Sequence, residues 1–310
     1  MSDKEEVSII LPVFNAVNTI ECCIDSIINQ TEKNWKLIIL NDGSTDGTKN
    51  IIESYEKKHQ KIFIWSFNKN LGLVNALNKG LQLAQGKFIA RMDADDEMLP
   101  NRIKQQLEVF KNDASIDICG MSYILNKKNI KLNFSTHDEI TKSLFFCNPI
   151  VHPTVMMKVS KKIKIKYQNS VCEDYDLWTR LAMQGAIFKN INKPGIIYNR
   201  SSNQKSIIEK NLMSNDAILV AKKYSDFTNF DSKNLLSEVN YTFDQVGHKS
   251  LIRVLEQITR KNIFNIESVD SYFFKRLTKR AVLSLNFKSI VSVLYFLLSK
   301  PRFILKLISR

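Results

Sequence analysis

Hydrophobic and polar positions alternate in blocks through the first part of the chain. Short apolar runs predict strands: VSIILPV at 7–13, which is expected to be buried, WKLIIL at 35–40, KIFIW at 61–65, KFIARM at 87–92 and IDICGM at 116–121. Between these runs, apolar residues recur at helical spacing and predict helices from Ile20 to Ile28, near 48–58, at about 72–84 and after Pro100. Strands that alternate with helices predict an α/β fold, with a mostly parallel sheet covered on both faces.

The rest of the chain follows a different pattern. Residues 126–200 are mixed, with a helix expected to start at EDYDLWTRL (173–181) and a strand-like GIIYNR (195–200). After 205 the pattern is almost wholly helical. We therefore expect a first domain over 1–205 and a helical C-terminal region over 206–310.

Acidic residues gather where the predicted strands end. Asp42 follows one strand directly, and Asp93, Asp95 and Asp96 follow another. Ligands of parallel sheets bind at the carboxyl ends of the strands. Closely spaced carboxylates can share a hard cation such as Mg²⁺ or Mn²⁺, and a solvated acidic turn is the alternative. Asp42 could accept hydrogen bonds from a nucleobase edge, although an ordinary strand-to-helix turn would look the same.

A second acidic group lies at the start of the helix expected from residue 173. Glu173, Asp174 and Asp176 are favoured there by the helix dipole alone, and one of them could instead act as a general base. His152, directly before a proline, is either a structural residue or a contact to a ligand.

The composition narrows the class of protein. Lys and Arg number 45 against 31 Asp and Glu, a net charge of +14, which favours anionic partners. The five cysteines show neither zinc-ligand spacing nor a disulfide framework, as expected in a reducing cytosol. The N-terminus lacks the features of a signal peptide, and the 11 residues between Lys288 and Lys300 are too few to span a bilayer.

The motifs occur in the order of a known family. They are PVFN at 12–15, NDGS at 41–44, NLGLVNALNKGL at 70–81, GKFIARMDADD at 86–96, HPTVM at 152–156 and EDYDLWTRL at 173–181. In these motifs, over roughly residues 6–200, the chain resembles the bacterial family 2 glycosyltransferases, which act on nucleotide sugars. The resemblance implies a GT-A fold, a Rossmann-like mixed sheet flanked by helices, and inverting transfer of a sugar. It also implies surface-glycan synthesis (capsule, O-antigen or lipooligosaccharide).

The resemblance also assigns residues. Asp93 and Asp95 match the DxD pair that holds Mn²⁺ or Mg²⁺, and Asp174, with Glu173 beside it, matches the catalytic base. The remaining matched positions would contact the donor: Pro12, Val13, Asn15, Asp42, Asn70, Arg91, Asp93, Asp96 and His152. The donor would be a nucleotide-diphosphate sugar, with a UDP-hexose or UDP-N-acetylhexosamine expected, and glucose, galactose and their N-acetyl forms all open. The acceptor would be a hydroxyl of a glycan or a lipid-linked precursor.

Two departures from the family pattern limit the assignment. Many relatives carry an arginine where this chain has Leu77, so Arg91 would have to serve any such contact. The QxxRW element of processive synthases is missing, which favours transfer of a single sugar.

The C-terminal region carries its own signal. Residues 273–310 contain nine Lys or Arg and no Asp or Glu, with Phe and Leu residues interspersed. A basic amphipathic helix is typical of a membrane-surface element, and packing on the protein's own core is the alternative. We therefore expect a cytoplasmic enzyme bound peripherally to an anionic membrane, at the cytoplasmic face of a bacterial inner membrane.

Two other classes of protein account for parts of the pattern. A nucleotidyltransferase also uses strand-end carboxylates and a metal, but it predicts a glycine-rich loop after the first strand, and LPVFNAVNTI contains no glycine. A non-enzymatic protein that binds nucleic acid or membrane would leave the acidic groups at the strand ends unexplained. No nucleic-acid partner is therefore expected, and no motif specifies an oligomeric state.

Overall fold

The computed structural model describes residues 7–131, 133–144, 148–199 and 210–228. The chain divides into two compact units, of which the larger takes 7–141 and 148–217 within the described residues. All the predicted site residues lie in this larger unit. The basic stretch from Phe273 lies outside the described residues, and the domain division at 205 stays a prediction.

Four strands form the parallel part of the sheet. In spatial order they are β3 (Ile62–Ser66), β2 (Trp35–Asn41), β1 (Val7–Val13) and β4 (Phe88–Arg91). Every residue of β1 is buried, as expected for a strand covered on both faces. The strands predicted over these four runs are present. Strand β3, at the edge of the sheet, is only partly buried, with Phe63 and Trp65 exposed.

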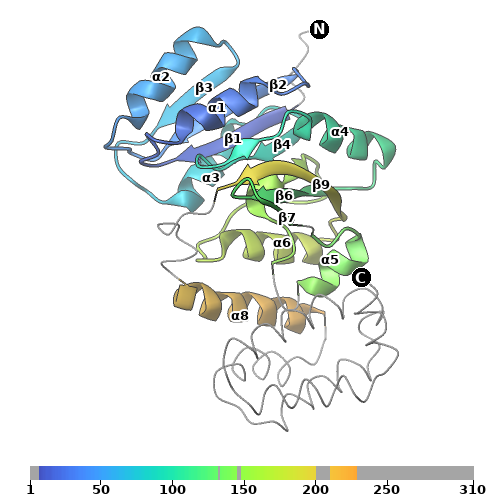
Figure 1. Ribbon diagram of the computed structural model, residues 1–310. Coiled ribbons are helices and arrows are strands. Elements are labelled where there is room, and N and C mark those ends of the chain that lie inside the picture. The colour runs from blue at the N-terminus through green and yellow to red at the C-terminus, as the bar shows by residue number, and fades with distance from the viewer. Residues whose placement is uncertain (1–6, 132, 145–147, 200–209, 229–310) are drawn as a thin grey trace. The chain divides into compact units, whose positions relative to one another are not determined.

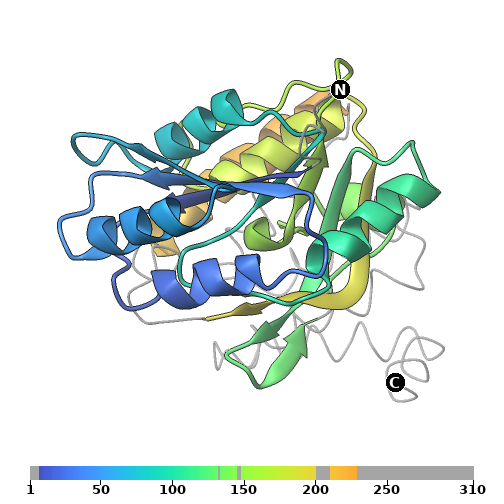
Figure 2. The same cartoon turned by 90° about the horizontal axis from the view of Figure 1, so that it is seen from above.

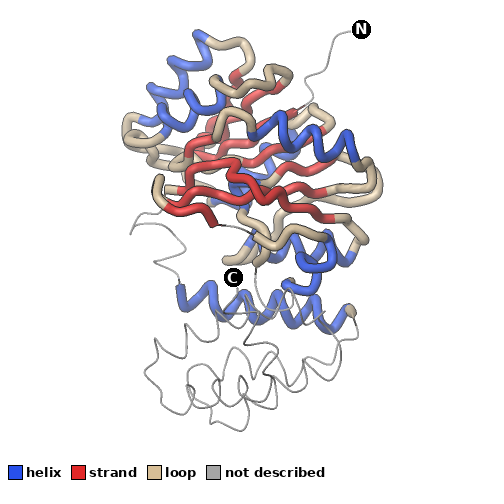
Figure 3. The backbone as a smooth tube through the Cα atoms, turned by 45° about the vertical axis from the view of Figure 1, so that its right-hand side comes forward, coloured by secondary structure: helices blue, strands red, loops and turns tan. Residues whose placement is uncertain are grey.

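The other strands extend the same sheet in mixed orientation (Figures 1 and 3). Beyond β4 the order is β8 (Met156–Lys158), β6 (Ile118–Leu125), β9 (Phe188–Tyr198) and β5 (Glu97–Met98), and β7 (Asn129–Lys131) pairs with β6. Strand β8 is antiparallel to both β4 and β6, whereas β6 and β9 are parallel. The expected mixed α/β sheet is therefore present.

Helices cover both faces of the sheet (Figure 2). On one side lie α1 (Ile20–Ile28), α2 (Thr48–Lys58) and α4 (Arg102–Asn112), and on the other lie α3 (Leu73–Leu83) and α6 (Glu173–Met183). The remaining helices are α5 (His137–Ser143), the 3₁₀ turn η1 (His152–Thr154) and α8 (Lys210–Phe227). None of the described helices has the length and apolar character that crossing a membrane requires.

Side chains on the two faces of β1 pack into two different layers of the core. Ile9 packs in one apolar cluster with Ile24 of α1 and Ile52 of α2. Ile10, on the opposite face, packs under α3, where a Cβ on Gly80 would come within 2.6 Å of the Ile10 side chain. Glycine at this position thus lets α3 approach the sheet closely.

Candidate functional site

The first part of the candidate site forms where β2 ends. The backbone N–H of Asp42 donates to Val13 O over 2.8 Å, which joins the ends of β1 and β2. The two carboxylate oxygens of Asp42 accept hydrogen bonds from Leu71 N and Gly72 N, each over 2.8 Å. Asp42 therefore anchors the loop before α3, and each oxygen keeps a lone pair that a ligand could use.

Gly43 explains why this loop can lie so close. Its φ is +72°, and a Cβ there would lie 2.5 Å from Lys69 C and 2.7 Å from Asn70 N. Any other residue would be strained by its backbone angle and would also push the 69–70 segment away. The motif NDGS thus places Asn70 beside the end of β2.

The end of β1 and the loop after it form the second part of the candidate site. Pro12 and Val13 are buried, whereas Asn15 is exposed and has a positive φ of 49°. Asn15 Oδ1 accepts a hydrogen bond from Thr45 N over 2.9 Å, which ties this loop to the loop after β2. The residues predicted to surround a nucleoside therefore lie at the end of β1 and on loops that are joined to one another.

The acidic loop, residues Asp93 to Asp96, follows β4. A carboxylate oxygen from each of Asp93, Asp95 and Asp96 lies within 4.8 Å of the others. Asp93 forms an ion pair with Arg91, whose side chain is 4% exposed. Burial and the charges of Asp93 and Asp95 raise the pKa of the Asp96 carboxyl. The cluster therefore concentrates negative charge in a small volume.

These oxygens suit a divalent cation. Hard cations such as Mg²⁺ and Mn²⁺ prefer carboxylate oxygen ligands. Among the described residues, Asp96 Oδ2 is buried without a hydrogen-bond partner. A buried carboxylate oxygen that lacks a hydrogen bond is costly, and a cation would compensate for it.

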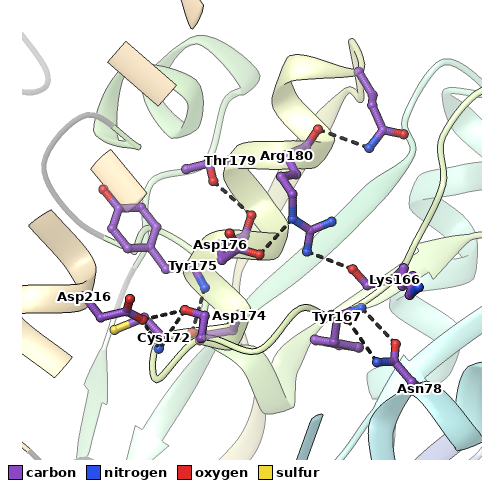
Figure 4. A network of polar contacts seen from close by, with 12 residues as sticks. Asn78, Lys166, Tyr167, Cys172, Asp174, Tyr175, Asp176, Thr179, Arg180 and Asp216 are labelled. Atoms are coloured by element: carbon purple, nitrogen blue, oxygen red, sulfur yellow. Dashed lines mark hydrogen bonds and ion pairs between the residues drawn. The ribbon is translucent and has the colours of Figure 1, made fainter. Parts of the chain in front are cut away.

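The second acidic group lies at the start of α6, where its acids point to different partners (Figure 4). Asp176 forms an ion pair with Arg180 over 2.8 Å. Asp174 accepts hydrogen bonds from Tyr175 N over 2.7 Å and from Asn148 Nδ2 over 2.6 Å. Burial raises the pKa of the Asp174 carboxyl, so this group resists ionisation more than a free aspartate does.

His152 lies in η1, against α6, and is only 6% exposed. Its Nε2 lies 2.7 Å from Tyr167 Oη, and its Nδ1 lies 4.0 Å from Glu173 Oε1. Burial and the nearby Arg91 charge lower the pKa of the imidazole well below its usual value, so it is neutral at pH 7. Its ring meets the buried Trp178 edge-on, so both side chains pack in the interior. That His152 also contacts a ligand stays a prediction.

Arg91 connects the two acidic groups. Its guanidinium forms an ion pair with Asp93, and its charge also acts on Glu173, Asp96 and Asp174. Acidic residues some 80 positions apart in the sequence therefore lie within the electrostatic influence of one buried cation. The resemblance assigned Arg91 to the donor contacts, and that role stays a prediction. In the structure its side chain is buried and paired with Asp93.

Sequence reasoning missed several residues that hold the site together. Asn199, after β9, donates from its backbone N to Asp96 Oδ1 and from Nδ2 to Asp95 O, both over 2.9 Å. Arg102 Nη2 donates to Arg91 O over 2.9 Å and to Val155 O over 3.1 Å. Asp216 accepts from Cys172 N over 2.9 Å, just before α6. No local pattern marks these residues, because each contact joins distant segments.

Comparison with known proteins identifies the class. The family model "Glycosyl transferase family 2" matches residues 8–164, just over half of the chain. An uncharacterized glycosyltransferase from Haemophilus influenzae is 28% identical over 309 residues, covering 94% of this chain and 90% of the relative.

Two solved structures have a similar fold. S. aureus TarS (residues 1–349), in complex with UDP-GlcNAc, aligns with a TM-score of 0.60 and 15% identity over 89% of this chain and 80% of that chain. The mannosyltransferase PcManGT from Pyrobaculum calidifontis, in complex with GDP-Man and Mn²⁺, aligns with a TM-score of 0.57 and 15% identity over 96% of this chain and 87% of that chain.

The chain belongs to glycosyltransferase family 2 and has the GT-A type of fold. The resemblance read from the motifs is confirmed, and so is the enzyme class, a glycosyltransferase.

Proposed function

We propose that this protein is a metal-dependent, inverting glycosyltransferase that moves a single sugar from a nucleotide-diphosphate sugar to a hydroxyl group. The donor is a UDP-hexose or UDP-N-acetylhexosamine, and the acceptor is a glycan or lipid-linked precursor of a surface polysaccharide. The missing QxxRW element supports transfer of one sugar.

One observation carries this proposal: the buried Arg91 is paired with Asp93 of the acidic loop, and its charge also acts on Glu173 and Asp174 at the start of α6. A transfer reaction needs a site for the leaving diphosphate and a base for the attacking hydroxyl. Two separate acidic groups around one cation meet both needs. A non-enzymatic binding protein would have no use for the second group.

The donor end of the site comprises the loops after β1, β2 and β4. Pro12, Val13, Asn15, Asp42 and Asn70 would surround the nucleoside, and Asp93 and Asp96 would face the diphosphate and sugar. Asp95, with Asp93, would hold Mn²⁺ or Mg²⁺, as its oxygen donors suit such an ion. A bound cation supplies charge neutralisation for the departing diphosphate. PcManGT, a neighbour in fold, has Mn²⁺ in its complex.

The acceptor end of the site centres on Asp174. In this proposal its carboxylate takes the proton of the acceptor hydroxyl as that oxygen attacks the anomeric carbon. The bond from that carbon to the nucleotide diphosphate breaks on the opposite face, which inverts the configuration. The raised pKa of Asp174 brings the base closer to the operating pH, where general bases work best. Glu173 lies beside it, and His152 Nδ1 of η1 lies 4.0 Å from Glu173 Oε1.

Calorimetric titration with UDP, with and without Mn²⁺, tests the donor end. We expect UDP to bind in the presence of Mn²⁺ and to lose most of that affinity in Asp95→Ala, while Asp226→Asn, an exposed aspartate of α8, serves as the matched control. The same titration is repeated with GDP, because PcManGT, a neighbour in fold, was solved in complex with GDP-Man. Tighter binding of GDP than UDP would refute the UDP donor, and equal binding by Asp95→Ala would refute the metal site.

The basic C-terminal stretch extends the proposal to the cytoplasmic face of the membrane. Lys275, Arg276, Lys279 and Arg280 would attract anionic lipid at about 1 kcal/mol each. Replacing all four with Gln in the full chain should reduce sedimentation with phosphatidylglycerol vesicles and leave UDP binding intact. Undiminished sedimentation would refute this attachment.

A further inference from the structure

Asn148 is an exposed residue whose side chain reaches the start of α6. Its Nδ2 donates a hydrogen bond to Asp174 Oδ2 over 2.6 Å. The other end of the amide is also held, because Ile150 N donates to Asn148 Oδ1 over 3.2 Å. Since a backbone N–H can bond only the amide oxygen, this second contact turns the NH₂ group of Asn148 toward Asp174.

Asp174 is therefore held by two donors on different oxygens. Tyr175 N donates to Oδ1 and Asn148 donates to Oδ2. Two donors on two oxygens resist rotation of the carboxylate plane. Each oxygen still has a lone pair available for an incoming hydroxyl.

The same contacts bear on the charge of Asp174. Burial raises the pKa of this carboxyl, whereas the hydrogen bonds from Tyr175 and Asn148 and the charge of Arg91 on β4 lower it. Other ionisable groups around it among the described residues are Tyr167, Glu173 and His152, which lies beside Glu173. Asp216 of α8 bonds Cys172 N, directly before α6. Asn148 is thus a neutral, exposed residue whose hydrogen bond favours the ionised form of Asp174.

We propose that Asn148 is a positioning residue for the transfer reaction, which orients the Asp174 carboxylate and favours its ionised form through the Nδ2–Oδ2 hydrogen bond. This inference rests on the proposed function, in which Asp174 is the base. Asn148 lies within the stretch that the family model matches, yet no motif of the sequence singled it out.

A double-mutant cycle in the absence of substrate is the first test. Unfolding by urea is measured from pH 4.5 to 8.5 for wild type, Asn148→Ala, Asp174→Asn and the double variant. At the highest pH, we expect Asn148→Ala to lower the folding equilibrium constant about tenfold more in the wild-type background than in the Asp174→Asn background, with the difference shrinking as the pH falls. Asn112→Ala, at the exposed end of α4, is the control. A coupling that does not change with pH would overturn the proposal.

The second test follows UDP release from UDP-N-acetylglucosamine with water as the acceptor, as a function of pH. Asn148→Ala should move the acidic limb of the rate profile upward by about one pH unit and leave UDP affinity unchanged. Asn148→Gln, which keeps the amide, should recover part of the shift. A reduced rate with an unmoved acidic limb would mean a purely structural residue and would overturn the proposal.

The two tests separate the proposals. A wild-type rate in Asp174→Asn would overturn the assignment of the base and this inference together. Loss of the rate in Asp174→Asn, combined with an unmoved profile in Asn148→Ala, would overturn this inference alone.

Discussion

The acidic loop after β4 and the start of α6 both gather carboxylates, and they manage the charge differently. In the loop, Asp93, Asp95 and Asp96 face one another at close range, and Arg91 pairs with Asp93. At α6 the acids point apart, because Asp176 meets Arg180 and Asp174 meets Asn148. The helix N-terminus itself also favours negative charge.

This difference separates two kinds of chemistry. A cluster whose repulsion is only partly relieved is suited to a cation, which removes the remaining repulsion. A single carboxylate that is hydrogen-bonded and raised in pKa by burial is suited to accepting a proton. The same residue type thus serves two ends of one site, and the surroundings decide which.

The largest expected effect comes from removing the proton acceptor at α6. Asp174→Asn should lower turnover by about 10²- to 10⁴-fold, because general-base catalysis contributes that much. UDP binding should stay near the wild-type value, since the donor end lies at the acidic loop. Single-turnover kinetics and calorimetry measure both, with Asp226→Asn as the control. Full turnover in Asp174→Asn would remove the distinction between the two acidic groups.

The next effect concerns Arg91, whose charge acts on both acidic groups. Arg91→Met removes a buried charge-assisted contact to Asp93 and should lower the free energy of unfolding by about 1.5–3 kcal/mol. Added Mn²⁺ should restore part of that loss, because a cation at the acidic loop would relieve the same repulsion. Urea unfolding with and without Mn²⁺ checks this. A variant whose loss is the same in both conditions would contradict a cation site in the loop.

A smaller effect is expected at Asn199, which supports the acidic loop and not α6. Asn199→Ala loses the side-chain hydrogen bond to Asp95 O. Residues that orient metal ligands typically contribute about tenfold to affinity, so Mn²⁺ binding should weaken by that factor. Electron paramagnetic resonance of free Mn²⁺ measures it, and Asn112→Ala is the matched control. Unchanged affinity would mean that the loop holds its shape without β9.

The smallest effect is a pH dependence at the α6 side. The folded protein holds His152 neutral, so its imidazole binds a proton less readily than in the unfolded chain. Native stability should therefore be complete above the unfolded pKa of about 6.5 and should fall as the pH drops below it. The slope should be shallower in His152→Gln. Thermal unfolding from pH 5 to 8 checks this, and equal slopes would assign the pH dependence to other groups.

The sequence predicted the parallel part of the sheet better than the mixed part. The apolar runs at β1, β2, β3 and β4 are continuous, and the structure contains all four strands. The strand expected at 195–200 instead begins at Phe188, as part of β9. Asn190, Lys193 and Pro194 conceal the first half of β9. The extra residues of β9 are taken up in a bulge around Pro194, opposite Ser122 of β6. Only the partner strand makes that irregular segment a strand.

By itself, the sequence determined the elements and the chemical types at their ends. Runs of apolar residues predict strands, and Asp42 and Asp93 follow two of them, whereas Asp174 lies at the start of a predicted helix. These three residues could therefore be singled out with no coordinates. The tertiary structure decided which of these residues meet. The charge of Arg91 acts on Glu173, and Asn148 donates a hydrogen bond to Asp174. Asn199 donates a hydrogen bond to Asp95 O, 104 residues away in the sequence. Such contacts depend on how strands pair across the sheet, and hydrophobic periodicity, which is local, carries no information about them.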